Sequence, residues 1–142
     1  MATTYCVWLA KMRNSLLLLA VFWAFDAHSR DAGPLLRIVD GDTYEMLIEG
    51  FPTKVRLANA DTPESGRRAR CAVERSLADR ATDWVAEQFA TRQVAVFPSW
   101  RLDKYRRPLV RIRLDGQDLG DLLVGNGLAR PYHGERRLPW CS

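Results

Sequence analysis

Histidine and cysteine are scarce in this sequence, and their scarcity excludes several kinds of catalytic site. The 142 residues include two histidines, His28 and His133, and three cysteines, with no Cys-x-x-Cys pair or Cys/His cluster. A zinc site is therefore not expected. The sequence also lacks a Gly-x-Ser-x-Gly elbow and a glycine-rich phosphate loop, so neither a serine hydrolase nor a P-loop enzyme is predicted.

Long hydrophobic runs are lacking as well. The apolar stretch over residues 16–25 is about ten residues long, too short to cross the roughly 30 Å core of a bilayer. Lys11 and Arg13 precede it, and the small-residue sequence Ala27-His28-Ser29 follows it. This pattern predicts a secretory signal peptide over residues 1–29 and a secreted or periplasmic domain over residues 30–142. An uncleaved membrane anchor is the alternative, and the start could be Met1 or Met12.

Removal of the leader would also remove Cys6 and leave Cys71 and Cys141. In an oxidising compartment these two could bond and close a loop containing most of the domain. Two unrelated thiols are an equally good interpretation of the sequence.

The bulk composition indicates one ordinary globular domain. Hydrophobic residues make up 47% of the chain and charged residues 27%, which excludes disorder and collagen-like repeats. The formal net charge is +4. A basic protein of this kind attracts polyanions, so nucleic acid is a reasonable partner.

Hydrophobic periodicity predicts an α+β fold. Strand-like alternation begins at Leu35, and residues 50–52 separate its later runs as a hairpin connection. A helix is expected over residues 67–89, then strands over 94–97 and 109–114, and a short helix over 119–124. The apolar stripe expected on the long helix comprises Val73, Leu77, Ala81, Trp84, Val85 and Phe89. Five strands with a helix between the third and fourth suit a small closed barrel of the OB type.

Three charged clusters lie between these elements. The first is Val-Asp-Gly-Asp-Thr at residues 39–43, which alone resembles a turn and lacks the remaining ligands of an EF-hand. The second combines Val-Arg-Leu at 55–57 with Asp-Thr-Pro-Glu at 61–64, typical of an exposed strand face and a helix start. The third, Asp-Lys-Tyr-Arg-Arg at 103–107, alone is a solvated charge run.

Taken in this order and spacing, the clusters resemble the thermonuclease (staphylococcal nuclease-like) family over about residues 35–132. Asp115-Gly116 and Gly-Leu-Ala-Arg at 127–130 extend the resemblance. It implies a five-stranded OB-fold barrel and a calcium-dependent endonuclease that hydrolyses phosphodiester bonds of DNA and RNA and leaves 3′-phosphates. It implies nucleic acid as the partner, a monomer, and no obligate protein partner.

The resemblance also implies a role for each matching residue. The expected Ca²⁺ ligands are the carboxylates of Asp42 and Asp61 and the carbonyl of Thr62, which suit a cation that prefers oxygen. Asp40 would support the metal or simply shape the turn. The expected catalytic residues are Arg56, Glu64 and Arg107, with the two arginines stabilising the phosphate and Glu64 activating water. The expected substrate-binding residues are Lys104, Tyr105 and Tyr132.

Arg106 departs from the family pattern, because it stands where the family usually has glycine. If this position has a positive φ, an arginine would cost roughly 1 kcal/mol and could displace Arg107. A noncatalytic OB-fold module that binds nucleic acid or protein is the main alternative, but the expected carboxylates and arginines are all present. We also hypothesise that Cys141 fastens the C-terminal segment to the helix through Cys71.

Overall fold

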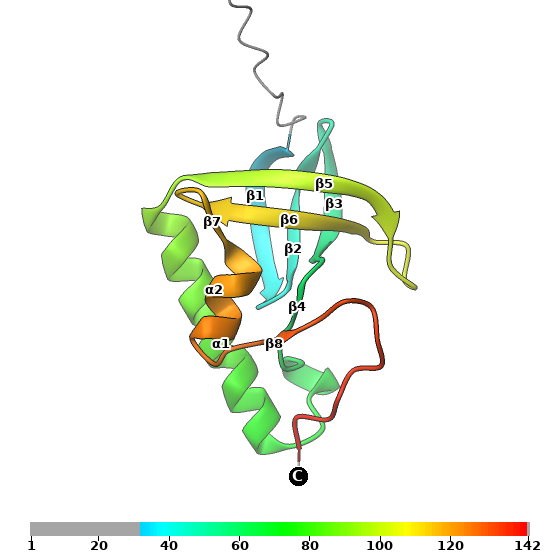
Figure 1. The fold of residues 1–142 in the computed structure, drawn as a ribbon, viewed down its shortest axis with the longest axis vertical. Coiled ribbons are helices and arrows are strands. Elements are labelled where there is room, and N and C mark those ends of the chain that lie inside the picture. The colour runs from blue at the N-terminus through cyan, green and yellow to red at the C-terminus, as the bar shows by residue number, and fades with distance from the viewer. Residues whose placement is uncertain (1–31, 142) are drawn as a thin grey trace, which may run out of the picture.

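A curled mixed sheet forms the body of the protein in a computed structural model that describes residues 32–141 (Figure 1). The strand order is β1-β2-β3-β6-β5, with β7 paired to β6. All pairs in this sheet are antiparallel except β3 with β6, where Arg56 lies opposite Leu109. The strands are β1 (Ala32–Asp40), β2 (Thr43–Ile48), β3 (Phe51–Leu57), β5 (Val94–Leu102), β6 (Pro108–Leu114) and β7 (Gln117–Asp118).

The sheet gives the α+β, OB-like fold expected from the sequence, with one difference. Residues of β1 and β5 come within 8 Å of one another between Cα atoms, but no hydrogen-bonded ladder joins these two strands in the described part of the chain. The predicted closed barrel is therefore partly open. The leader expected over residues 1–29 lies outside the described residues.

Local sequence explains the strands and their turns. In β6, Val110, Ile112 and Leu114 are buried and the arginines between them are exposed, as the alternation predicts. The β2–β3 turn uses Glu49 (φ 51°) and Gly50 (φ 83°), a pair of positive φ angles typical of tight hairpins. The turn is therefore earlier than the predicted 50–52, and Phe51 already begins β3.

The long helix α1 (Ala72–Thr91) begins later than predicted, and its predicted apolar stripe is confirmed at Ala81 and Val85, which are buried, and at Trp84 and Phe89, which pack against the core, but not at Val73. Residues 66–68 form the 3₁₀ turn η1 (Gly66–Arg68), and Cys71 caps α1 through a contact from the Glu74 amide to its Sγ (3.4 Å). The buried helix residues are Glu74, Ala78, Ala81 and Val85. Val73, placed on the apolar stripe, is 63% exposed, whereas Glu74 is 3% exposed. Glu74 is buried in the first turn because its carboxylate accepts backbone N–H groups of the preceding loop.

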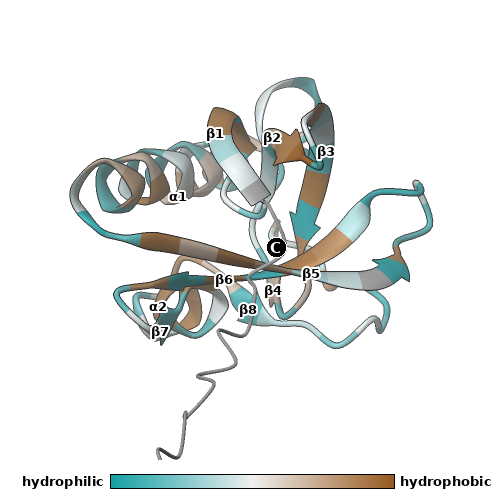
Figure 2. Cartoon of the chain, turned by 90° about the horizontal axis from the view of Figure 1, so that it is seen from above, coloured by the Kyte–Doolittle hydropathy of each residue, from teal (hydrophilic) through white to brown (hydrophobic). Residues whose placement is uncertain are grey.

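The core lies between the sheet, α1 and the short helix α2 (Leu119–Gly125). Apolar colour is concentrated on the strands, α1 is a mixture of apolar and hydrophilic colour, and the β5–β6 turn is mostly hydrophilic (Figure 2). None of the helices within residues 32–141 combines the length and apolar character needed to cross a bilayer. The largest fully buried side chains include Tyr44, Met46, Leu57, Ile112, Leu114, Leu119 and Leu123.

Two very short strands complete the fold and were not predicted. β4 (Ala60–Asp61) pairs with β8 (Arg130–Pro131), so that Asp61 lies opposite Arg130. Two residues are too few to give a periodic signal in the sequence. Their pairing brings the segment that follows β8 beside the loop that follows β4 (Figure 1).

Candidate active site

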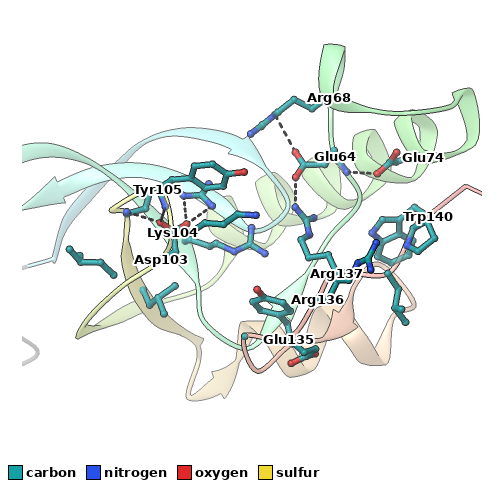
Figure 3. A pocket seen from close by; sticks show the side chains of 18 of the residues that line it. Glu64, Arg68, Glu74, Asp103, Lys104, Tyr105, Glu135, Arg136, Arg137 and Trp140 are labelled. Carbon is teal, nitrogen blue, oxygen red and sulfur yellow. Dashed lines mark hydrogen bonds and ion pairs between the residues drawn. The ribbon is translucent and has the colours of Figure 1, made fainter.

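A cleft of about 810 Å³ lies between the β5–β6 turn and the segment 132–141, which we call the strap (Figure 3). Its wall contains three predicted catalytic residues, Arg56, Glu64 and Arg107. It also contains the three predicted substrate-binding residues. Six residues therefore meet at one cleft, five of them from the second and third clusters and the sixth, Tyr132, from near the C-terminus.

Arg56 holds the two predicted metal-ligand carboxylates together. It leaves β3 on the side opposite Val55 and Leu57, yet its side chain is 6% exposed. One Nη lies 2.7 Å from Asp42 Oδ1 and the other 3.2 Å from Asp61 Oδ1. The interpretation of Arg56 as part of an exposed strand face is therefore wrong. Both carboxylates share one guanidinium, so they are close enough to act on a common cation.

The loop between β1 and β2 is shaped to present Asp42. The amide of Thr62 donates to Asp42 Oδ2 (2.9 Å) and the Thr43 hydroxyl donates to Oδ1 (3.0 Å). A Cβ at Gly41 would lie 2.8 Å from Thr62 Cγ2 and 2.9 Å from Ala81 Cβ. Glycine between the two aspartates is required because the loop approaches Thr62 and α1 this closely.

Glu64 is held between two arginines. Its Oε2 lies 3.2 Å from Arg68 Nε, and its Oε1 forms a close ion pair with Arg137 Nη1. Its backbone amide donates to Glu74 Oε1 (3.3 Å), and the other Glu74 oxygen accepts from the Arg70 amide (2.7 Å). Glu74 thereby fixes the loop that presents Glu64. Cys71-x-x-Glu74 has the spacing of a helix capping box, which is the signal that could have identified Glu74.

Asp40 is the buried neighbour of this network. Its Oδ2 accepts from Arg68 Nη2 (2.8 Å), and its side chain is 4% exposed. Burial, with a further contribution from Asp42, raises the pKa of Asp40 to about 6 despite Arg68. Asp40 therefore supports Arg68 beside Glu64 as well as shaping the turn.

The β5–β6 turn positions Arg107. Asp103 accepts the backbone amides of Tyr105 (2.9 Å) and Arg107 (2.8 Å) on one oxygen, and the Arg107 guanidinium at 2.6 Å on the other. Burial raises the pKa of Asp103, but the hydrogen bonds from Arg107 outweigh it and the net pKa is lowered. Arg107 Nη1 also lies 3.2 Å from the Thr43 hydroxyl, which contacts Asp42. Arg106 has φ 62°, yet Arg107 still lines the cleft.

The substrate-binding candidates lie on two sides of the cleft. Lys104 and Tyr105 are exposed on the β5–β6 turn, with Lys104 Nζ 5.0 Å from the centre of the Tyr105 ring. Tyr132 begins the strap, and the Arg56 guanidinium lies 5.4 Å from its ring centre. The cleft therefore has an aromatic ring on each side of the arginines.

Arg137, in the strap, is a further site residue that was not predicted, besides Arg68 and Glu74. It forms a close ion pair with Asp61 through Nε, and its Nη2 donates to the carbonyl of Thr62 (2.8 Å). Its contact with Glu64 appears as a dashed line in Figure 3. Burial lowers the Arg137 pKa, but Asp61 and the Glu64 hydrogen bond outweigh it and raise the pKa. At Asp61 burial raises the pKa of the carboxyl group, and the charge of Arg137 offsets only part of this rise.

The strap is joined to α1 by a disulfide between Cys71 and Cys141, residues 70 apart in sequence. The sequence left open a bonded pair or two unrelated thiols, and the structure has the bonded pair. Glu74 lies near both sulfurs. The group is not a metal site, because sulfurs joined in a disulfide are not the thiolates that bind metals.

An OB-like sheet that presents two carboxylates, a carbonyl and two flanking arginines defines the architecture of a staphylococcal nuclease-like domain. A profile described as "Staphylococcal nuclease homologue" matches residues 54–138. The chain belongs to this family.

Three curated relatives match parts of the chain. The chain is 37% identical to "Protein ParB" of Escherichia coli over 68 residues, 45% of this chain and 38% of that protein. It is 34% identical to "Micrococcal nuclease" of Shigella flexneri over 77 residues, covering 54% and 39%. It is 29% identical to "Endonuclease YncB" of Bacillus subtilis (strain 168) over 94 residues, covering 66% and 44%. The matches thus span about two fifths of the length of these relatives.

Proposed function

We propose that this protein is a metal-dependent endonuclease that hydrolyses phosphodiester bonds of DNA and RNA. The observation that carries the proposal is that Asp42 and Asp61 meet on Arg56, and Asp61 and the Thr62 carbonyl meet on Arg137, beside a cleft lined by Arg56 and Arg107. Two relatives with nuclease names support the same activity. A module that only binds nucleic acid has no need of clustered carboxylates, which repel the phosphate backbone.

The donor atoms suit calcium. They are two carboxylates and a carbonyl, all oxygen, and Asp61 with the Thr62 carbonyl already surrounds a cation, the Arg137 guanidinium. The hydroxyl of Thr62 is buried without a hydrogen-bond partner among the described residues, leaving one more oxygen nearby. Asp42, Asp61 and Thr62 would hold the ion, which when bound would offset the negative charge that develops on the phosphate.

The remaining steps fall to the protein's own residues. Arg107, held by Asp103, would donate N–H groups to the equatorial phosphate oxygens, where charge accumulates in the transition state. Arg56 would add positive charge from the floor of the cleft while keeping Asp42 and Asp61 in place. Glu64 would take a proton from the attacking water. Attack at phosphorus with loss of the 5′-oxygen would leave a 3′-phosphate.

The surroundings of the site support a broad substrate range. Tyr105 and Tyr132 can stack on any base, and Lys104 adds a positive charge for the backbone. We expect single strands to fit this cleft better than duplex and sequence preference to be weak. The disulfide supports the proposed secreted or periplasmic location, because such bonds persist in oxidising compartments. We propose that the protein acts as a monomer.

Cleavage of single-stranded DNA and RNA with added Ca²⁺, and then with chelator, tests the proposal. We expect Asp61→Asn to lose most cleavage and Asp83→Asn, an exposed change on α1, to lose none. Glu64→Gln should lower kcat by at least about 100-fold, as expected for a lost general base. Substrate binding without cleavage at any calcium concentration would contradict the proposal and favour a binding module.

A further inference from the structure

Arg137 contacts three groups that the proposed reaction needs. Its guanidinium pairs with the Asp61 carboxylate, donates to the Thr62 carbonyl at 2.8 Å and pairs with the Glu64 carboxylate. Two of these are proposed metal ligands and the third is the proposed base. One side chain therefore lies where the ion would bind and also pairs with the carboxylate that would accept the proton.

A divalent ion and Arg137 cannot use these oxygens at once. Calcium binds oxygens at about 2.3–2.6 Å, so an ion held by Asp61 and the Thr62 carbonyl would lie where the Arg137 guanidinium now contacts them. Asp61 is 3% exposed, enclosed between Arg56 and Arg137. Two positive charges within a few ångströms repel strongly away from bulk water. Entry of the ion therefore requires Arg137 to leave.

The strap is fastened on both sides of Arg137. Before it, β8 pairs with β4, and after it, Cys141 is bonded to Cys71. Trp140 lies against Arg130, with the guanidinium 3.9 Å from the ring centre. A side chain anchored in this way has a high effective concentration at the site.

We propose that the strap is an autoinhibitory element in which Arg137 competes with the divalent ion for Asp61 and Thr62 and covers Glu64. This inference rests on the proposed metal-dependent function. The disulfide keeps Arg137 near the site, and ion binding displaces the guanidinium without breaking the tether. Because the two states exclude one another, whatever weakens the hold of Arg137 raises the open fraction of the site and strengthens apparent metal binding in proportion to that fraction.

Calorimetric titration with Ca²⁺ tests the competition directly. We expect Arg137→Ala to bind Ca²⁺ about tenfold more tightly or better, because the wild-type site is open only part of the time. Arg136→Ala, the exposed neighbour, should match the wild type. Arg137→Gln provides a second neutral variant that keeps hydrogen-bonding groups, and circular dichroism verifies that each variant is folded.

Limited trypsin digestion gives a readout without turnover. Calcium usually protects a metal-binding protein, but here it should accelerate cleavage after Arg137, because the displaced strap becomes accessible. Replacing Cys71 and Cys141 with serine should also accelerate this cleavage and tighten Ca²⁺ binding. Serine at position 71 still caps α1, so the helix start is retained.

The outcomes separate the two proposals. Equal or weaker Ca²⁺ binding by Arg137→Ala would overturn the strap inference, as would slower cleavage after Arg137 with calcium. If the same preparations still cleave DNA only with calcium, the proposed function stands. If neither protein binds Ca²⁺ and neither cleaves, the proposed function fails and the strap inference fails with it.

Discussion

Arg107 and Arg137 line the same cleft, but they are held there in opposite ways. Arg107 is held by Asp103, four residues before it, within one turn. Arg137 is held by residues 73–76 positions earlier in the chain and by a disulfide at the end of the strap. The first arginine is positioned by local structure and the second by the tertiary fold. Under the strap proposal, Arg107 belongs to the part of the site that stays in place and Arg137 to the part that an ion displaces.

The largest expected effect is the difference in cleavage between variants of these two arginines. Arg107→Ala should lower kcat by about 100- to 1,000-fold, the loss typical when a fixed donor to a transition-state anion is removed. Arg137→Ala should instead cleave faster than the wild type at limiting calcium and similarly at saturating calcium. Initial rates on single-stranded DNA across a calcium series measure both effects.

An exposed arginine outside the cleft serves as the control. Arg111→Ala, on β6, removes an ion pair with Asp118 of β7. The change should leave both kcat and calcium dependence unchanged. A loss of kcat in Arg137→Ala comparable to that in Arg107→Ala would make Arg137 part of the catalytic machinery. The distinction between the two arginines would then disappear.

The difference in how the arginines are held also explains what the sequence could predict. Asp103 and Arg107 form one short motif, so their roles follow from the resemblance to a family. Asp42, Arg56 and Asp61 also lie in short motifs, and the fold brings them together on one guanidinium. The strands themselves are predictable because alternation in segments such as β6 is regular, whereas the OB-type arrangement of the sheet was implied by the family resemblance.

The rest depends on contacts that leave little trace in the sequence. β4 and β8 are two residues long, so no periodicity marks them, yet their pairing brings the strap to the site. Glu74 has the capping-box spacing from Cys71, but the sequence does not show that its carboxylate accepts two loop amides. Arg137 lies in a basic run without regular structure, and only the tertiary fold places it against Asp61 and Glu64.

The next effect concerns stability on the strap side of the cleft. Replacing both Cys71 and Cys141 with serine should lower the free energy of unfolding by up to about 4 kcal/mol, because the bond spans 70 residues and restricts the unfolded chain. Urea denaturation without reductant measures the loss. An unchanged unfolding midpoint would contradict a stabilising tether. Asp103→Ala, which disturbs only the Arg107 turn, gives the matched local comparison.

The contributions of Asp40 and Asp103 to stability should respond oppositely to pH. The pKa of Asp40 is raised to about 6, so between about pH 4 and 6 the folded state holds a proton that the unfolded state has lost. Its contribution to stability is therefore greatest below pH 4 and declines as pH rises through 6, by up to about 3 kcal/mol without metal. The pKa of Asp103 is lowered, so its contribution is present above pH 4 and is lost on acidification.

Urea midpoints of the wild type, Asp40→Asn and Asp103→Asn between pH 3 and 7 test this contrast. The stability of the wild type relative to Asp40→Asn should fall as pH rises from 4 to 7. The stability of the wild type relative to Asp103→Asn should fall as pH drops below 4. Parallel curves for the wild type and Asp40→Asn would show that Asp40 does not hold its proton in the folded state.

The smallest effect tests how rigid the Arg107 turn is. Arg106 has φ 62°, a conformation that costs a non-glycine residue about 1 kcal/mol, so Arg106→Gly should raise the free energy of unfolding by about that amount. Arg106→Ala removes the exposed side chain but keeps the strain, so it should gain nothing. If Asp103 alone positions Arg107, neither variant should change kcat. A rise in kcat with glycine but not alanine would show that strain at position 106 displaces Arg107, and the turn would then be less rigid than its hydrogen bonds imply.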